Sequence, residues 1–223
     1  GANQKEDACR FATALLYFAI GFAILLSAGT LLLLHPILNW LDTPKEIYDD
    51  SYWYLFGISF DYIGLLMLNL YMAMRQSAGD SRSGVKLNTC ASLFNAVLDP
   101  IFIFVFHFGI LGAAIATVVS KLIMVPLAWR RLHDKEFPVH IDFRTYPFRP
   151  ADGKMILKLC IPAASGQFLE NLGFVIMNKY IVYYGAIAIS AYGVGAKLVT
   201  LAYIPVTSIG TILATFVGQN LGA

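Results

Sequence analysis

Apolar residues run through this chain in long stretches separated by short polar segments. A bilayer core of about 30 Å takes about 20 residues of α-helix to cross. The pattern therefore predicts six membrane-spanning helices, at residues 11–34, 52–74, 87–106, 111–129, 156–183 and 188–217. The fifth is expected to bend or break near Pro162, because proline lacks the backbone N–H that a helix interior uses.

The composition supports a membrane chain. Apolar residues make up 58% and charged residues 13%, and mean hydropathy is +0.65. Soluble domains carry about 25% charged residues. We expect an all-α integral membrane protein in contact with the lipid bilayer, without a nucleic-acid partner. The chain reads as a piece of a longer protein.

No signature of hydrolytic or nucleotide chemistry is present in the sequence. HExxH, GxxxxGK[ST] and GxSxG are absent, and the three cysteines form no CxxC. The chain is therefore predicted not to be an enzyme and to carry no cofactor or structural metal. An intramembrane enzyme is the less favoured alternative. It would need a nucleophile paired with a base, or a set of metal ligands, and the sequence shows neither pattern.

Basic residues alternate between the two sides of the predicted helices. One side holds the N-terminal basic residues, those between helices two and three, and those of the long segment 130–155. The other side has only Lys45 among acidic neighbours. By the positive-inside rule, both ends of the chain and the long segment are predicted to be cytoplasmic, in a multi-pass protein of the inner (plasma) membrane.

The third predicted helix carries a polar stripe of Asn88, Ser92, Asn95 and Asp99. Spacings of four, three and four place all four on one helix face. Pro100 frees a backbone carbonyl within a turn of Asp99. Carboxylates inside membranes mostly mark ion or substrate pathways. Asp99 and Asn95 are therefore candidates for holding a proton or a small cation, and a hydrogen-bonding carboxylate remains the structural alternative.

Polar residues also interrupt four other predicted helices. Gln167, Glu170 and Asn171 share a face of the fifth helix, where Glu170 could carry a proton or pair with an organic cation. Asp61 and Asn69 lie two turns apart in the second helix and are read as sharing a face. Further candidates that could pair with a carboxylate or extend to the interface are Lys179 and Lys197; Lys121 is expected to extend to the interface.

Several segments together resemble the multidrug and toxic compound extrusion (MATE) family. The main one is "NAVLDPIFIF" followed by "GILGAAIATVVS". Others are "AGDSRSGVKLNTCASLFN", "IPAASGQFLENLGFVIMN", "YYGAIAISAYGVGAKL" and "FVGQNLGA". The resemblance implies a two-lobe, twelve-helix antiporter fold. It assigns 1–129 to helices three to six of the first lobe, 130–155 to a cytoplasmic inter-lobe linker, and 156–223 to the first two helices of the second lobe.

The resemblance also implies roles for named residues. Asn95 and Asp99 match the cation or proton site of the first lobe, Thr117 its hydroxyl partner, and Asn69 an asparagine of the same site. Glu170 matches a second-lobe acidic position, which makes Gln167 and Asn171 part of a proton or substrate site. A metal is expected nowhere, apart from Na⁺ at Asp99.

The implied function is secondary active export of cationic, amphipathic small molecules in exchange for H⁺ or Na⁺ by a monomer. A lipid-linked oligosaccharide flippase of the same superfamily is the alternative. It would need a cationic cavity, whereas Asp61, Asp99 and Glu170 stand against Lys179 and Lys197 here.

Overall fold

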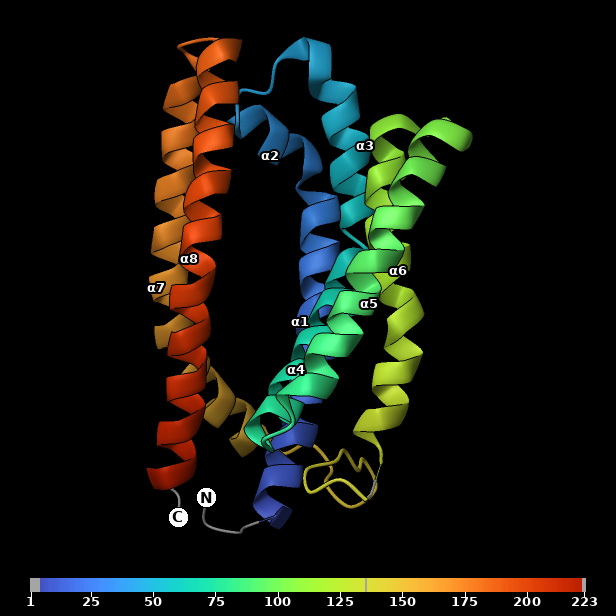
Figure 1. Cartoon of the computed structure of the whole chain (residues 1–223), viewed down its shortest axis with the longest axis vertical. Helices are drawn as coiled ribbons and strands as arrows, with labels where there is room; N and C mark the ends of the chain where they lie inside the picture. The colour runs from blue at the N-terminus through green and yellow to red at the C-terminus, as the bar shows by residue number, and fades with distance from the viewer. Residues whose placement is uncertain (1–4, 135, 222–223) are drawn as a thin grey trace. The chain divides into compact units, whose positions relative to one another are not determined.

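The computed structural model describes residues 5–134 and 136–221, and in these ranges every regular element is a helix (Figure 1). In chain order the elements are α1 (Lys5–Leu32), α2 (Leu34–Trp40), η1 (Lys45–Ile47), α3 (Tyr48–Ile58), α4 (Asp61–Ser77), α5 (Ser81–Pro100), η2 (Ile101–Val105), α6 (Gly109–Leu132), α7 (Pro150–Val182) and α8 (Ala186–Leu221). Contacts divide the chain into two compact units, Lys5–Gly153 and Lys154 onward.

The helices are long and apolar enough to cross a membrane five times, or six times if a bent pair counts as one span. The bent pair is Lys45–Ile58 with Asp61–Ser77. The prediction of an all-α membrane chain is confirmed, and the five or six candidate spans are compatible with the six predicted. The helices extend beyond most predicted bounds.

The second span is not the continuous helix predicted for 52–74. It bends by 46° between α3 and α4. The Ser59 hydroxyl donates to the Leu55 carbonyl at 2.6 Å, and the Ser59 carbonyl accepts from the Ser27 hydroxyl of α1 at 2.7 Å. Bonds of this kind compete with the helical ladder and cause kinks. The bend therefore coincides with a local hydrogen bond and with a contact to another helix, and the local sequence does not reveal the second.

Helix α6 is the centre of the first unit and packs against α3, α4, α5 and η2. Glycines permit the close approach. A Cβ at Gly64 of α4 would lie 2.9 Å from the Cβ of Lys121, and one at Gly112 would lie 2.8 Å from the backbone of Phe102 in η2. Gly109 and Gly112 belong to α6, which begins before the predicted residue 111, and His107 just before it has a φ of +56°.

The buried core of this unit joins α1, α4, α5 and α6. Tyr71 and Leu16 are fully buried at its centre, and Ile141 from the segment after α6 completes it. Its remaining members are Ala12, Met67, Leu68, Met74, Leu87, Ala91, Met124, Ala128 and Leu132. Small and flexible side chains fill this core, which suits closely spaced helices.

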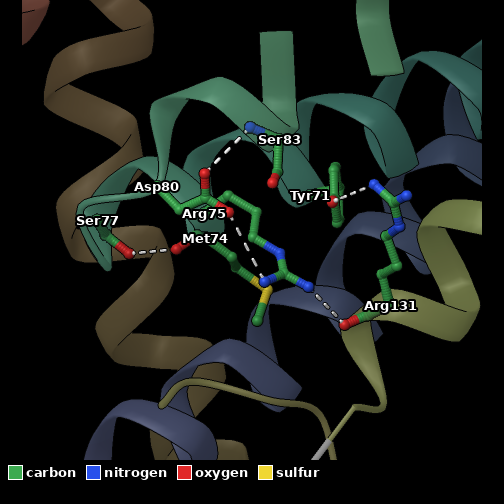
Figure 2. A network of polar contacts seen from close by, with 7 residues as sticks. All are labelled: Tyr71, Met74, Arg75, Ser77, Asp80, Ser83 and Arg131. Carbon is green, nitrogen blue, oxygen red and sulfur yellow. Dashed lines mark hydrogen bonds and ion pairs between the residues drawn. The ribbon is translucent and has the colours of Figure 1, made fainter. Parts of the chain in front are cut away.

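The buried Arg75 side chain of α4 connects the α4–α5 turn with α6 (Figure 2). Arg75 donates to the Arg131 carbonyl at 3.1 Å, lies 3.9 Å from the Asp80 carboxylate, and stacks 3.6 Å over the Phe137 ring. Arg131 in turn donates to the Tyr71 hydroxyl at 3.4 Å. The arginine therefore connects α4, the α4–α5 turn, α6 and the segment after α6.

The Asp80 carboxylate begins α5 by accepting from the Ser83 backbone N–H at 3.1 Å. Its hydrogen bonds with the Ser83 side chain and backbone, with Arg75 as a smaller cause, hold the pKa of Asp80 below its usual range. The N-cap at this turn is therefore charged at neutral pH.

The segment between α6 and α7 is shorter than the predicted 130–155 linker, because α6 reaches Leu132 and α7 begins at Pro150. Its described part packs on the first unit. The Ile141 N–H donates to the Leu132 carbonyl at 2.8 Å, and Phe143 contacts the Tyr17 ring edge-on at 5.0 Å. Arg10 of α1 pairs with Asp152 at 2.5 Å, which fixes the first turn of α7.

The second unit consists of most of α7 and α8, and the chain reverses between them at Gly185 with a φ of +87°. Helix α7 continues through Pro162, so of the bend or break predicted there the break is not found, and the bend stays a prediction. The Ser165 hydroxyl donates to the Pro162 carbonyl at 2.8 Å there. Large apolar side chains of both helices are exposed along their length, as on surfaces that lipid or further helices cover.

Candidate functional site

A carboxylate, a carboxamide and a hydroxyl meet between α5 and α6. The Asn95 amide donates to the Asp99 carboxylate at 3.3 Å and to the Thr117 hydroxyl at 3.4 Å. Thr117 also donates to the Ala113 carbonyl at 2.9 Å, which fixes its rotamer. All three side chains are half-buried. We call Asn95, Asp99 and Thr117 the cation cluster; its role stays a prediction.

The backbone around Pro100 positions this cluster. After Pro100 the helix widens into the π-helical turn η2, where the Phe106 N–H donates to the Ile101 carbonyl at 3.0 Å. Proline cannot donate and its ring crowds the preceding turn, so a wider turn relieves it. Because Gly112 lets α6 contact the backbone of η2, Thr117 comes within reach of Asn95.

Other polar residues of the predicted stripe do not join the cluster. Asn88 and Ser92 are exposed on α5. Asn69 of α4 is exposed as well, and within the described residues its side chain has no hydrogen bond to the cluster. Asp61 is buried, so the expectation that Asp61 and Asn69 share a face is wrong: eight residues rotate a helix by about 80° beyond two turns.

Asp61 instead pairs with a residue for which we expected another role. Lys121 of α6 donates to one Asp61 carboxylate oxygen, Oδ2. Lys121 lies twelve residues from Gly109 and eleven from Leu132, so its ammonium is far from both ends of α6. The expectation that Lys121 extends to the interface is therefore wrong. That central position is the sequence signal for a buried partner.

The second-lobe candidates lie on one exposed face of α7. The Gln167 amide donates to the Glu170 carboxylate at 3.1 Å, and the Asn171 amide donates to the Gln167 carbonyl at 2.8 Å. Lys179 is half-buried on the same helix, and Lys197 is exposed on α8. The predicted face is therefore present as a local hydrogen-bonded group, and its role stays a prediction.

The part of the chain that the structure describes contains no cluster of side chains of the kind that binds a metal ion. No three His, Cys, Asp or Glu side chains there lie close enough to hold a metal ion. Cys9 lies 3.8 Å from the His140 ring in a cavity of about 240 Å³ near the start of α1. Two such groups are too few for a zinc site.

A family model and several known proteins match the chain. The MatE family model matches residues 1–101 and 162–223. The probable multidrug resistance protein YpnP of Bacillus subtilis is 28% identical over the whole chain, which covers 49% of that relative. The FAD transporter of Shewanella oneidensis is 28% identical over 94% of the chain and 47% of the relative. The chain thus spans about half the length of the curated relatives it matches.

Solved structures share the fold. A MOP superfamily transporter from Pyrococcus furiosus superposes with a TM-score of 0.89 at 21% identity, over 99% of this chain and 49% of that one. The Vibrio cholerae MATE transporter VcmN superposes in its bent form with a TM-score of 0.80 at 24% identity, over 100% and 50%. At this identity the likeness concerns the fold, and the chain corresponds to about half of the twelve-helix arrangement.

Proposed function

Because the chain belongs to the MATE family, we propose that it forms part of an ion-coupled exporter of cationic, amphipathic compounds, with the cation cluster as its H⁺ or Na⁺ site. The meeting of the Asp99 carboxylate with Asn95 and Thr117 carries the proposal. Because the members of this family are transporters, the alternative that the protein is an intramembrane enzyme is no longer supported. Coupling follows if the ion and the drug compete, or if they favour different conformations.

The chemistry of the cluster suits a coupling ion. Protonating Asp99 would remove its charge, while Na⁺ would take oxygen ligands from Asp99 and Thr117. The Asn95 amide now directs its N–H groups at both, so it occupies the position of a cation. Half a turn of the amide would offer its oxygen instead, as a third ligand. The cluster can thus exchange an internal donor for an external cation.

On this proposal the orientation follows the basic residues. The end that carries Arg75, Arg82 and Arg131 lies in the cytoplasm, and the loop with Lys45 lies outside. Gln167, Glu170 and Asn171 then form a second site for a proton or for the drug, on the lobe that begins with α7.

Cation binding to the full-length protein tests the cluster. We expect Na⁺ at fixed pH, or a lower pH without Na⁺, to raise the melting temperature of the wild type and not of Asp99→Asn. Asn keeps the shape of Asp99 and cannot ionise, so folding should survive. Asn88→Ala, an exposed change on the same helix, is the control and should respond as wild type does. Equal protection of Asp99→Asn by either cation would refute the cluster as the site.

A dinucleotide such as FAD is the second candidate cargo, because one relative is an FAD transporter. Vesicles that contain the full-length protein should be assayed with ethidium and with FAD in parallel. If the protein exports ethidium and the Glu170→Gln variant exports less of it, the result supports a cationic cargo and a role for Glu170 in its export. If the vesicles export FAD and do not export ethidium, the cargo is a dinucleotide and not a cationic compound.

A further inference from the structure

Buried Asp61 and half-buried Lys121 form an ion pair that the proposed coupling does not use. Asp61 is 7% exposed, and Lys121 donates to its Oδ2 oxygen. The other carboxylate oxygen, Oδ1, is buried without a hydrogen-bond partner among the described residues. Lys121 is therefore the group that compensates this carboxylate, and loss of either partner leaves a charge in the apolar interior.

The pair lies next to the cation cluster. Lys121 follows Thr117 by four residues on α6, which is one helical turn or about 6 Å along the axis. Asp61 is the first residue of α4, at the 46° bend of the second span. Gly64, one turn further along α4, allows the approach that brings the carboxylate to Lys121. One helix, α6, thus carries a residue of both groups.

Asp61 is buried and Lys121 is half-buried, so solvent screens their charges less than it would screen charges at an exposed site. A unit charge roughly 12 Å from a bound cation changes its affinity about tenfold at an effective dielectric near 20. The intact pair is neutral as a whole, so it adds little to the field at Asp99. An uncompensated Lys121 would repel a cation at Asp99, and an uncompensated Asp61 would attract it.

We propose that the Asp61–Lys121 pair, by staying neutral as a whole, keeps the cation affinity of the cluster formed by Asn95, Asp99 and Thr117 at the level that the Asp99 charge alone gives. The ammonium and the carboxylate balance one another, so the Asp99 charge decides how tightly the ion is held. The pair acts through the field at the cluster and does not touch the ion. This inference rests on the proposed function, because it needs an ion at Asp99.

A structural pair and an affinity-setting pair make different predictions. If the pair only joins α4 to α6, removal of either partner weakens the cluster in the same direction. If its charges set the affinity, the two removals shift the affinity in opposite directions. The double variant, which removes both charges, should then return toward the wild type.

The test measures the Na⁺ concentration, or the pH without Na⁺, that gives half-maximal thermal protection of the full-length protein. Asp61→Asn should need about tenfold more cation, and Lys121→Met about tenfold less. The double variant Asp61→Asn/Lys121→Met should fall within about threefold of the wild type. Asp61→Ser and Lys121→Gln remove the same charges with other shapes, so the test survives a failure of one variant to fold.

Lys86→Met is the control, because it also removes one positive charge but from an exposed site on α5. It should leave the half-maximal concentration unchanged. Shifts of the same sign in both single variants, or no shift in either, would overturn the inference. Cation protection that persists in Asp99→Asn would instead refute the proposed function, so the two failures are distinguishable.

Discussion

At the scale of residues, the amide of one asparagine connects both polar partners of the cation cluster. Asn95 reaches Asp99 at 3.3 Å and Thr117 at 3.4 Å. Both distances exceed the usual 2.7–3.2 Å of such bonds, so a cation that displaces the amide breaks weak contacts. A group that is held loosely in this way suits a site that must bind and release an ion in each cycle.

Asp80 provides a residue-scale prediction for stability. Asp80→Ala should lower the free energy of unfolding by about 1 kcal/mol near neutral pH, because α5 loses its N-cap. Since the pKa of Asp80 is lowered from its ordinary 3.8, the contribution of its charge is fully present above that value. It is lost as the pH falls below it, through the folded pKa.

Thermal unfolding of the detergent-solubilised protein near pH 7 and near pH 3 measures this effect. The difference between wild type and Asp80→Ala should shrink at the lower pH. Asp80→Asn keeps a capping oxygen without the charge, so its stability near pH 7 should lie between those of Asp80→Ala and the wild type. A difference that is as large near pH 3 as near pH 7 would show that the carboxylate charge does not contribute.

Side-chain contacts could be predicted from the sequence only where they are local. Asn95 and Asp99 are four residues apart on a helix, so their contact follows from the helical period. The pairing of Asp61 with Lys121 joins residues sixty apart on two helices, and no local rule selects that partner. Thr117 entered through the family resemblance, because a threonine in an apolar helix usually bonds to its own backbone.

At the scale of elements, α6 organises the first unit because small residues face its neighbours. In lipid there is no hydrophobic driving force for helices to associate, so close packing of their backbones provides much of the attraction. Gly112 contacts the backbone of η2, and the widened turn after Pro100 supplies the matching surface. The position of the cation cluster therefore depends on an element contact that contains no polar side chain.

Gly112→Ala should destabilise the protein by about 1–3 kcal/mol, because the new Cβ would meet the Phe102 carbonyl at 2.8 Å and backbone cannot easily yield. It should also weaken cation protection by moving Thr117 from Asn95. Gly21→Ala on α1 is the matched control: nothing lies within 4 Å of its Cβ, so stability should hold or rise slightly. Equal melting temperatures for the two variants would contradict the packing argument.

Element positions were predictable from hydropathy, while breaks were not. The six spans follow from runs of apolar residues. The bend after Ile58 falls where the Ser59 carbonyl accepts from Ser27 of α1, and α7 continues through Pro162 although proline favours a break. Both outcomes are decided by contacts or by tolerated local strain, which a periodic pattern does not contain.

At the scale of the whole molecule, the segment after α6 belongs to the first unit. Ile141 lies in its core, and Arg75 stacks on Phe137. The boundary between the units comes after Gly153, once the Arg10–Asp152 pair has fixed the start of α7. The sequence pattern predicted a separate linker here and did not indicate that this segment packs into the core of the first unit.

Cysteine labelling tests the orientation of the molecule. In a full-length protein whose native cysteines are replaced, Arg82→Cys and Arg144→Cys should react with a membrane-impermeant maleimide only from the cytoplasmic side. Lys45→Cys should react only from outside, since basic loops stay in the cytoplasm. Labelling of Arg144→Cys in intact cells would reverse the proposed topology.

The central claim is that the Asp99 carboxylate couples an ion gradient to export. The most direct measurement is ethidium export by the full-length protein in vesicles under an imposed H⁺ or Na⁺ gradient. We predict that Asp99→Asn abolishes gradient-driven export, because Asn cannot ionise. The variant should reach wild-type protein levels, because removing a charge does not hinder membrane insertion. Undiminished export by Asp99→Asn under either gradient would contradict the account.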